Sequence, residues 1–418
     1  MNIDLRVRLG DLELKNPLIA GSGPLTHSYN NLKNAVEAGF GGIVTKTCTS
    51  TEYFRSYPRM EEYLLDFETR KDKVWYKPPY WSLYHRDHLQ HQHPEAWCEI
   101  LSRISKLCRE NDCILIGSIE AEQDITWWKK LAKMHEEAGC DALELNYCCP
   151  HPQVISEEYT TKTPVGAWTG KDPNLAANIV REVKKEVRIP CFPKLTPEAE
   201  DPSMIAAAVK GAGANGVTCL SRNLSLRIDI ETGKAIGYSY CSSSGPGTKE
   251  FSLRWVAKIA QEVVMPIMGA NGPVKWQDFI EFMMAGANAV QTCSAVMIYG
   301  YKYVGELLKE MTEFLNRKGY GSAQEIVGLA LPLGIGADIP KKFKAKYAVI
   351  DEENCTKCRR CLVVCYYSSL KAEKKKVFAE KDRCVGCGLC QWVCPYDVIT
   401  YKERTNEEEY LRALRSEA

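Results

Sequence analysis

The sequence predicts an α/β protein in which a (β/α)8 TIM barrel is followed by a small cysteine-rich domain. Three observations lead to this prediction. The chain has 418 residues, which is enough for a complete barrel and a short second domain. Its upstream part repeats a pattern in which a helix ends at a glycine and an apolar strand follows. Its downstream part carries eight cysteines at short, repeated spacings between residues 355 and 394.

The repeated helix-to-strand pattern occurs at four glycines, which are Gly39, Gly139, Gly213 and Gly286. Glycine can adopt the positive φ that ends a helix, and the run of apolar residues after it indicates a buried strand. The intervals leave room for further strand–helix units, as in a parallel sheet with helices outside. Further apolar strands are predicted at residues 18–20, 114–118, 191–195 and 266–270. A total of about eight strands over roughly 300 residues favours a (β/α)8 barrel.

The eight cysteines form two runs with the same spacing. The first run is Cys355, Cys358, Cys361 and Cys365, and the second is Cys384, Cys387, Cys390 and Cys394. Three close thiolates can each bind a different iron of a cubane, and the displaced fourth is placed to bind the other cubane. A zinc ribbon is an alternative, but it has no reason to repeat three close cysteines and a displaced fourth. We therefore predict two [4Fe–4S] clusters in a small two-cluster bacterial-type ferredoxin domain.

These features divide the chain into four parts. We expect a barrel over residues 1–318, a linker over 319–347, the ferredoxin-like domain over 348–402 and a charged tail over 403–418. A net charge of +1 gives no general attraction to nucleic acid or to a membrane surface. No apolar stretch approaches the ~18 residues of a membrane-spanning helix. The cysteines outside the two runs are scattered, which favours reduced thiols and a cytoplasmic location.

In a barrel of this kind, catalytic and binding residues come from the carboxyl ends of the strands. The expected strand ends supply Ser22, Lys46, Thr47, Asn146, Cys149, Lys194, Ser221, Arg222, Ala270, Asn271, Gly272, Cys293 and Ser294. The small residues after the last two strands suit a phosphate group. The segment from Gly211 to Gly216 matches a dinucleotide fingerprint, but it follows a helix and precedes a strand. A pyrophosphate site needs the reverse order, so we expect no direct nicotinamide binding.

Five segments at or near the expected strand ends resemble a known family. They are residues 16–22, 45–47, 145–151, 194–197 and 291–296. They resemble the FMN barrel of dihydropyrimidine dehydrogenase, within the dihydroorotate dehydrogenase superfamily, and the trailing ferredoxin unit resembles that enzyme's carboxyl-terminal module. The resemblance implies that Ser22, Lys46, Thr47 and Lys194 surround the flavin ring. It implies that the ribityl phosphate is held by Gly245, Ala270, Asn271, Gly272, Cys293 and Ser294. It also implies that Asn146 binds the substrate and that Cys149 is the general acid or base.

A flavin also fits the chemistry, because it can take up two electrons at once and release them singly to iron–sulfur clusters. We expect hydride to pass between FMN and one carbon of an activated C–C or C=C bond, while Cys149 moves a proton at the neighbouring carbon. An ordinary thiol pKa of about 8.5 suits both directions. Cys148 is a rival, but its one-residue offset is expected to turn it away from the site. The stretch from residue 150 to Asp172 is expected to act as a lid, with Asp172 capping the next helix.

The chain departs from the family pattern where the substrate would lie. His85 stands roughly where an asparagine is expected, and Ser221 and Arg222 replace an Asn–Thr pair. Residues 53–97 form an insert rich in tyrosine, tryptophan and histidine. Amide groups fit an imide ring, whereas arginine, histidine and aromatic walls fit a carboxylate or a flat aromatic body. We therefore assign His85, Ser221 and Arg222 to substrate binding and expect a substrate other than uracil or thymine. A metal site formed by histidines 85, 88, 91 and 93 is the alternative reading of the insert.

Three functions stay open at this stage. The leading one is a flavin- and iron–sulfur-dependent oxidoreductase that acts on a dihydropyrimidine-like or other conjugated carbonyl or carboxylate substrate. The alternatives are a dihydroorotate dehydrogenase and a non-catalytic electron-relay subunit of a larger complex. The expected redox partner is external, either an NAD(P)H-oxidising flavoprotein subunit or a soluble ferredoxin. We also expect a homo- or hetero-oligomer, with no nucleic-acid or membrane partner.

Overall fold

The computed structural model describes residues 3–52, 55, 62–67, 80–121, 125–149, 166–237, 240–331, 344–373 and 376–405. The chain divides into two compact units, Met1–Ile335 and Gly336–Ala418, which are described separately below. The predicted linker (319–347) and tail (403–418) lie partly outside the described residues. The domain limits inferred from the sequence therefore stay predictions.

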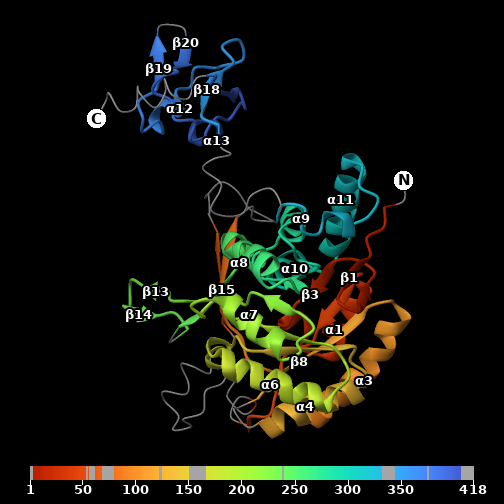
Figure 1. Ribbon diagram of the computed structural model, residues 1–418. Helices are drawn as coiled ribbons and strands as arrows, with labels where there is room; N and C mark the ends of the chain where they lie inside the picture. The colour runs from red at the N-terminus through yellow and green to blue at the C-terminus, as the bar shows by residue number, and fades with distance from the viewer. Residues whose placement is uncertain are drawn as a thin grey trace. The chain divides into compact units, whose positions relative to one another are not determined.

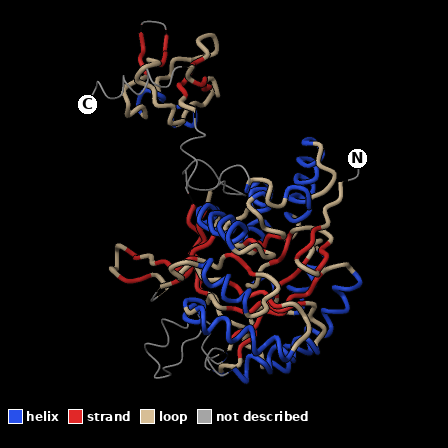
Figure 2. Tube along the Cα trace, in the orientation of Figure 1, coloured by secondary structure: helices blue, strands red, loops and turns tan. Residues whose placement is uncertain are grey.

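The first unit is a closed parallel barrel, with its strands inside and its helices around them (Figures 1 and 2). The barrel strands are β3 (Leu18–Ala20), β4 (Gly42–Val44), β8 (Ile114–Glu120), β9 (Ala142–Asn146), β10 (Cys191–Lys194), β11 (Val217–Cys219), β16 (Ile267–Gly269) and β17 (Ala289–Thr292). Each strand pairs with the next in this order, and β17 pairs back to β3, with Gln291 opposite Ile19. The predicted (β/α)8 barrel is confirmed, and all of its strands were anticipated from the sequence.

Helices follow the strands around the outside of the barrel. They are α1 (Tyr29–Glu37), α3 (Pro94–Glu110), α4 (Ile125–Glu137), α6 (Pro173–Glu186), α7 (Pro202–Gly211), α8 (Lys249–Glu262), α9 (Trp276–Met284), α10 (Ser294–Tyr299) and α11 (Tyr303–Lys318). Capping explains where several of them begin: the side chain of Asp172 accepts hydrogen bonds at the start of α6, and that of Asp201 does so for α7. The four glycines singled out in the sequence all adopt positive φ, between 87° and 110°.

The barrel core is apolar and continuous with the inner faces of the helices. Its strands are rich in Ile, Val, Leu and Ala, because a parallel strand in such a barrel is covered on both faces. Short elements complete this unit: β1 (Val7–Leu9), β2 (Leu12–Leu14), β5 (Cys48–Thr49), η1 (Pro24–Thr26), η2 (Gly166–Lys171), η3 (Pro246–Thr248) and η4 (Gln324–Ile326).

A second, four-stranded sheet is assembled from two inserts that are distant in sequence. Its strand order is β12 (Asn223–Ser225), β15 (Cys241–Ser244), β7 (Trp81–Arg86) and β6 (Glu62–Phe67). Strands β6 and β7 belong to the aromatic insert noted in the sequence, and β7 pairs with β15 so that His85 lies opposite Ser242. Between β12 and β15, the strands β13 (Ile228–Asp229) and β14 (Lys234–Ala235) form a hairpin that projects from the barrel (Figure 1). The pairing of the two inserts brings residues from both to the same cavity.

The second unit is small and cysteine-rich. Its elements are β18 (Lys346–Ile350), α12 (Arg360–Val363), β19 (Leu370–Glu373), β20 (Lys376–Ala379), α13 (Leu389–Trp392) and β21 (Ile399–Glu403). Strand β18 pairs with β21, and β19 pairs with β20, both antiparallel. Among the described residues, the buried cluster of this unit contains only six aliphatic residues and three cysteines. A core of this size gives little stability by itself, so bound iron–sulfur clusters are expected to hold this unit together.

Candidate active site

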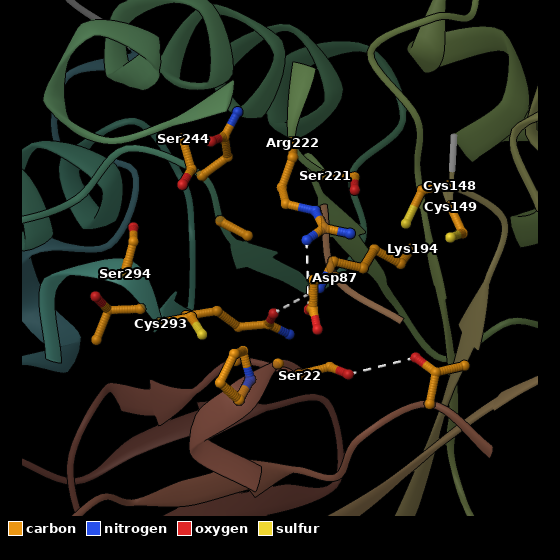
Figure 3. Close-up of a pocket in the computed structure, with 18 of the residues that line it drawn as sticks. Ser22, Asp87, Cys148, Cys149, Lys194, Ser221, Arg222, Ser244, Cys293 and Ser294 are labelled. Carbon is orange, nitrogen blue, oxygen red and sulfur yellow. Dashed lines mark hydrogen bonds and ion pairs between the residues drawn. The ribbon is translucent and has the colours of Figure 1, made fainter. Parts of the chain in front are cut away.

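A cavity that opens to solvent lies at the carboxyl ends of the barrel strands, with about 930 Å³ of space when its open part is included. Small-molecule and cofactor sites are typically found at this end of such a barrel. Its walls include every predicted barrel site residue except Gly245, and Figure 3 shows the labelled side chains around the space: Ser22, Cys148, Cys149, Lys194, Ser221, Arg222, Ser244, Cys293 and Ser294, together with Asp87. The strand ends predicted from the sequence thus meet in a single site.

One part of the wall is formed mainly by backbone. Asn271 and Gly272 have consecutive positive φ values of 67° and 109°. A Cβ at position 272 would lie 2.4 Å from the Cα of Lys249, at the start of α8, so only glycine fits there. Thr248 Oγ1 donates to Asn271 Oδ1 at 2.8 Å and fixes this loop. A concave backbone of this kind can hold a phosphate group.

Gly245 lies next to the wall residue Ser244 but outside the wall itself. Its φ is 120°, and an added Cβ would lie 2.8 Å from the ring of Trp81. The close approach of Trp81 explains the glycine, so the cavity gives no support to a role of Gly245 at the phosphate.

Lys194 belongs to a buried polar network on the barrel floor. Its Nζ donates to Glu144 Oε1 at 3.2 Å and to Gln291 Oε1 at 3.0 Å. Glu144 Oε2 also accepts from Thr218 Oγ1 at 2.9 Å and from Gln291 Nε2 at 2.7 Å. Two of the three donors of the Lys194 ammonium are therefore engaged, and the buried carboxylate of Glu144 is fully paired.

Lys46 belongs to a second charged network, which joins the barrel to the insert. Its Nζ lies 2.6 Å from Asp87 Oδ1, and Asp87 Oδ2 lies 3.5 Å from Arg222 Nη1. Burial alone would raise the pKa of Asp87, but the charges of Lys46 and Arg222 outweigh it and hold the pKa of that carboxyl well below its usual range. Asp87 is therefore a carboxylate shared by two cations.

Asn146 anchors a chain of polar groups between neighbouring strand ends. Its Nδ2 donates to Thr47 Oγ1 at 3.1 Å, and Thr47 Oγ1 lies 2.8 Å from Ser118 Oγ and 3.3 Å from Ser22 Oγ. Its Oδ1 accepts from the backbone N–H of Cys148 at 3.1 Å and from the Cys148 thiol at 2.9 Å. Asn146 is thus held in one orientation before any substrate binds.

Cys148 and Cys149 both line the cavity, and both are almost fully buried. The expectation that Cys148 turns away from the site is wrong. Its thiol donates to Asn146, and burial raises its pKa to about 11 although the charge of Lys194 opposes this. Because the Cys148 proton is engaged in this hydrogen bond, Cys149 stays the candidate for proton transfer that the sequence indicates. The predicted lid continues from Cys149, but residues 150–165 lie outside the described residues.

The cysteines of the second unit are arranged in a crossed pattern. Cys355, Cys358, Cys361 and Cys394 line one hollow, which joins three thiols of the first run to the last thiol of the second. Cys365 lies close enough to Cys390 to influence it electrostatically, together with Cys384 and Cys387. This exchange of the fourth cysteine is the arrangement that the two runs predict for paired cubanes.

Comparisons with known proteins agree with these two units. Residues 93–315 match the dihydroorotate dehydrogenase family, and residues 348–401 match the 4Fe-4S dicluster domain. The chain belongs to the dihydroorotate dehydrogenase family. It is 28% identical over 374 residues to the NAD-dependent dihydropyrimidine dehydrogenase subunit PreA of Escherichia coli K12, covering 87% of this chain and 85% of that protein. It is 31% identical over 336 residues to the dihydroorotate dehydrogenase B (NAD(+)) catalytic subunit of Thermococcus kodakarensis, covering 78% and 98%. The corresponding subunit of Pyrococcus abyssi is 30% identical over 333 residues, covering 78% and 99%.

Membership of the dihydroorotate dehydrogenase family makes this protein a flavin- and iron–sulfur-dependent oxidoreductase that acts on CH–CH groups. The cavity fits FMN, because its backbone loop at Asn271 and Gly272 suits a phosphate. No helix in the described part of the chain has both the length and the apolar character that a bilayer crossing requires.

Several polar wall residues were not predicted from the sequence, among them Asp87, Glu144 and Gln291 of the two charged networks. A signal existed for Glu144, which is the only charged residue in the otherwise apolar segment from Ala142 to Leu145. A signal also existed for Asp87, which directly follows the strand that ends at Arg86. The sequence prediction assigned His85 in this segment and not Asp87. Among the described residues, the histidines of the insert belong to no group that could hold a metal ion.

Proposed function

We propose that this chain exchanges hydride between FMN and an activated C–C or C=C bond of a conjugated carbonyl or carboxylate compound. Electrons then pass through two [4Fe–4S] clusters to an external partner. The observation that supports this most strongly is the convergence of Lys46, Asn146, Cys149 and Lys194 on one cavity, in a chain that also carries eight crossed cysteines. When bound, FMN supplies an acceptor that can be reduced by two electrons and reoxidised by one.

The residues of the chain have separate roles in this proposal. Ser22, Lys46, Thr47 and Lys194 border the flavin ring, and Ala270, Asn271, Gly272, Cys293 and Ser294 border its phosphate. Asn146 is fixed by Thr47 and Cys148 and presents its remaining N–H to the substrate. Cys149 gives or takes the proton at the carbon next to the one that exchanges hydride. The Cys149 side chain is largely buried, which limits its contact with water.

The eight clustered cysteines support two cubanes. One is bound by Cys355, Cys358, Cys361 and Cys394, and the other by Cys384, Cys387, Cys390 and Cys365. Because the chain has no Rossmann fingerprint in the required context, we propose that an NAD(P)H-oxidising flavoprotein subunit or a soluble ferredoxin exchanges electrons with these clusters. The cytoplasmic location and the oligomer expected from the sequence belong to the same proposal.

A second candidate function is the oxidation of dihydroorotate. The relatives from Thermococcus kodakarensis and Pyrococcus abyssi favour it, since both are named as catalytic subunits of dihydroorotate dehydrogenase B. The non-catalytic relay is less well supported, because the cavity keeps a paired Lys46 and a buried Cys149.

An anaerobic titration of the purified chain tests the proposed function. The flavin absorbance is followed while enoates, cyclic imides, orotate and their saturated forms are added singly. Bleaching by a saturated compound, or recovery of absorbance in the reduced protein by its unsaturated form, supports the proposal. Bleaching by dihydroorotate alone supports the second candidate. The absence of any response from a flavin that dithionite does reduce would contradict both.

A further inference from the structure

Arg222 has a free hydrogen-bonding edge in the cavity wall. Both of its side-chain interactions use Nη1, which lies 3.3 Å from His85 Nδ1 and 3.5 Å from Asp87 Oδ2. The guanidinium carries five N–H donors, so those of Nε and Nη2 have no partner among the described residues. About a quarter of the side chain is exposed. Figure 3 shows the guanidinium directed into the cavity toward Asp87.

Unlike the Nε and Nη2 groups of Arg222, the side-chain amides of the wall already make hydrogen bonds within the protein. Asn146 donates to Thr47 and accepts from Cys148. Gln291 donates to Glu144 and accepts from Lys194. Asn271 donates to Asn223 Oδ1 at 3.2 Å and accepts from Thr248. A cyclic imide is recognised through alternating donors and acceptors, and these amides already use their carbonyl oxygens within the protein. The free polar edge belongs to the guanidinium, which matches a carboxylate.

The charges of the wall also favour an anion. The ionisable wall residues other than histidine and cysteine are Lys46, Lys194, Arg222, Asp87 and Glu144. Glu144 is matched by Lys194 and by neutral donors, whereas Asp87 is shared between Lys46 and Arg222. Within the described part of the wall, one positive charge is therefore left without a matching carboxylate. The Lys46 ammonium lies 2.6 Å from Asp87 Oδ1. Its positive charge therefore weakens the repulsion between Asp87 and an anion bound in the cavity.

We propose that Arg222 binds the carboxylate of the substrate through Nε and Nη2, and that the substrate is a conjugated carboxylate and not a neutral cyclic imide. This inference rests on the proposed function and adds the substrate class to it. His85 and Asp87 hold Nη1 and thereby fix the orientation of the free edge. Arg222 and Cys149 line the same cavity and lie close enough to interact electrostatically, so a carboxylate on the free edge would lie near this thiol. A forked guanidinium recognises a planar carboxylate through two parallel hydrogen bonds, which a lysine cannot reproduce.

Binding to the oxidised, FMN-loaded full chain tests the proposal by isothermal titration calorimetry under anaerobic conditions. The probes are two matched pairs, benzoate with benzamide and crotonate with crotonamide. We expect the carboxylates to bind more tightly than their amides. R222Q should weaken carboxylate binding by about tenfold to a hundredfold, the range of charge-assisted hydrogen bonds, and leave amide binding unchanged. R222K should retain part of the preference.

The control variant is R254Q, which removes an arginine from the exposed surface of α8 and should bind every probe as the unmodified chain does. FMN content and the circular dichroism spectrum show whether R222Q is folded. Equal affinity for the two members of each pair, or no carboxylate binding at millimolar concentration, would overturn the inference while leaving the proposed function intact. A purified chain that holds no FMN would instead end the proposed function itself.

Discussion

Lys46 and Asp87 form a buried ion pair, with Nζ 2.6 Å from Oδ1 and no more than about 5% of either side chain exposed. Lys46 follows the barrel strand β4, whereas Asp87 follows β7 of the insert. The pair therefore fastens the insert to the rim of the barrel at the cavity. It also keeps Asp87 ionised, which in turn holds Arg222 in place.

Removal of Asp87 is expected to destabilise the barrel strongly. In D87A the ammonium of Lys46 stays buried without its carboxylate, which should lower the free energy of unfolding by about 3–5 kcal/mol. Urea unfolding followed by tryptophan fluorescence measures this change. The matched control is E313A, which breaks the exposed pair of Lys309 and Glu313 and should cost less than about 1 kcal/mol. Equal effects of the two variants would show that the buried pair is not important for stability.

Cys149 is expected to carry the proton transfer. C149A should keep its FMN and iron and slow turnover by about a hundredfold or more, the scale of general acid–base catalysis. C148A is the control, because the Cys148 thiol donates its hydrogen bond to Asn146 within the protein. Its turnover should fall less. A larger loss in C148A than in C149A would transfer the acid–base role to Cys148.

The crossed cysteine pattern predicts how single ligand losses affect the clusters. C394S should disturb the cubane of Cys355, Cys358 and Cys361, whereas C365S should disturb the other cubane. Each variant should lose up to about half of the iron. Iron analysis and electron paramagnetic resonance of the reduced protein distinguish the two clusters. Loss of the same signal in both variants would show that the fourth ligands are not exchanged.

His135 predicts a pH dependence of stability. It is buried on α4, its Nδ1 lies 2.8 Å from the carbonyl oxygen of Leu131, and burial lowers its pKa to about 4. Since this folded value lies below the ordinary value of about 6.5, the unfolded chain takes up the proton first as pH falls. The stabilisation is complete above pH ~6.5 and should decrease by on the order of 2 kcal/mol by pH ~5. Unfolding measured between these pH values should show a smaller slope for H135L than for the unmodified chain. Parallel slopes would mean that His135 does not titrate in this way.

The barrel could be predicted from the sequence because its signals are local. Each of Gly39, Gly139, Gly213 and Gly286 ends a helix through its own backbone freedom, and each strand is a short apolar run. The strand ends then follow from the topology, since a parallel barrel gathers them on one face. For this reason Lys46, Asn146 and Lys194 could be assigned to one site before their positions were known.

The charged networks could not be predicted in the same way, because they depend on pairings between distant segments. Asp87 meets Arg222 only because β7 pairs with β15, which brings together two inserts about 150 residues apart. Glu144 meets Gln291 across the barrel interior, at a distance that strand patterns do not encode. The Cys148 thiol remains at the site because its hydrogen bond to Asn146 holds it there, a contact that alternation along the chain did not indicate.

The most direct test of the account is to follow FMN and the clusters together after a conjugated carboxylate's saturated form is mixed anaerobically with the oxidised full chain. Optical spectra report the flavin, and electron paramagnetic resonance of rapidly frozen samples reports the clusters. We expect bleaching of the flavin followed by signals from reduced clusters, with both changes much slower in C149A. A protein that is not yellow, or whose flavin is reduced while its clusters stay oxidised, would contradict it.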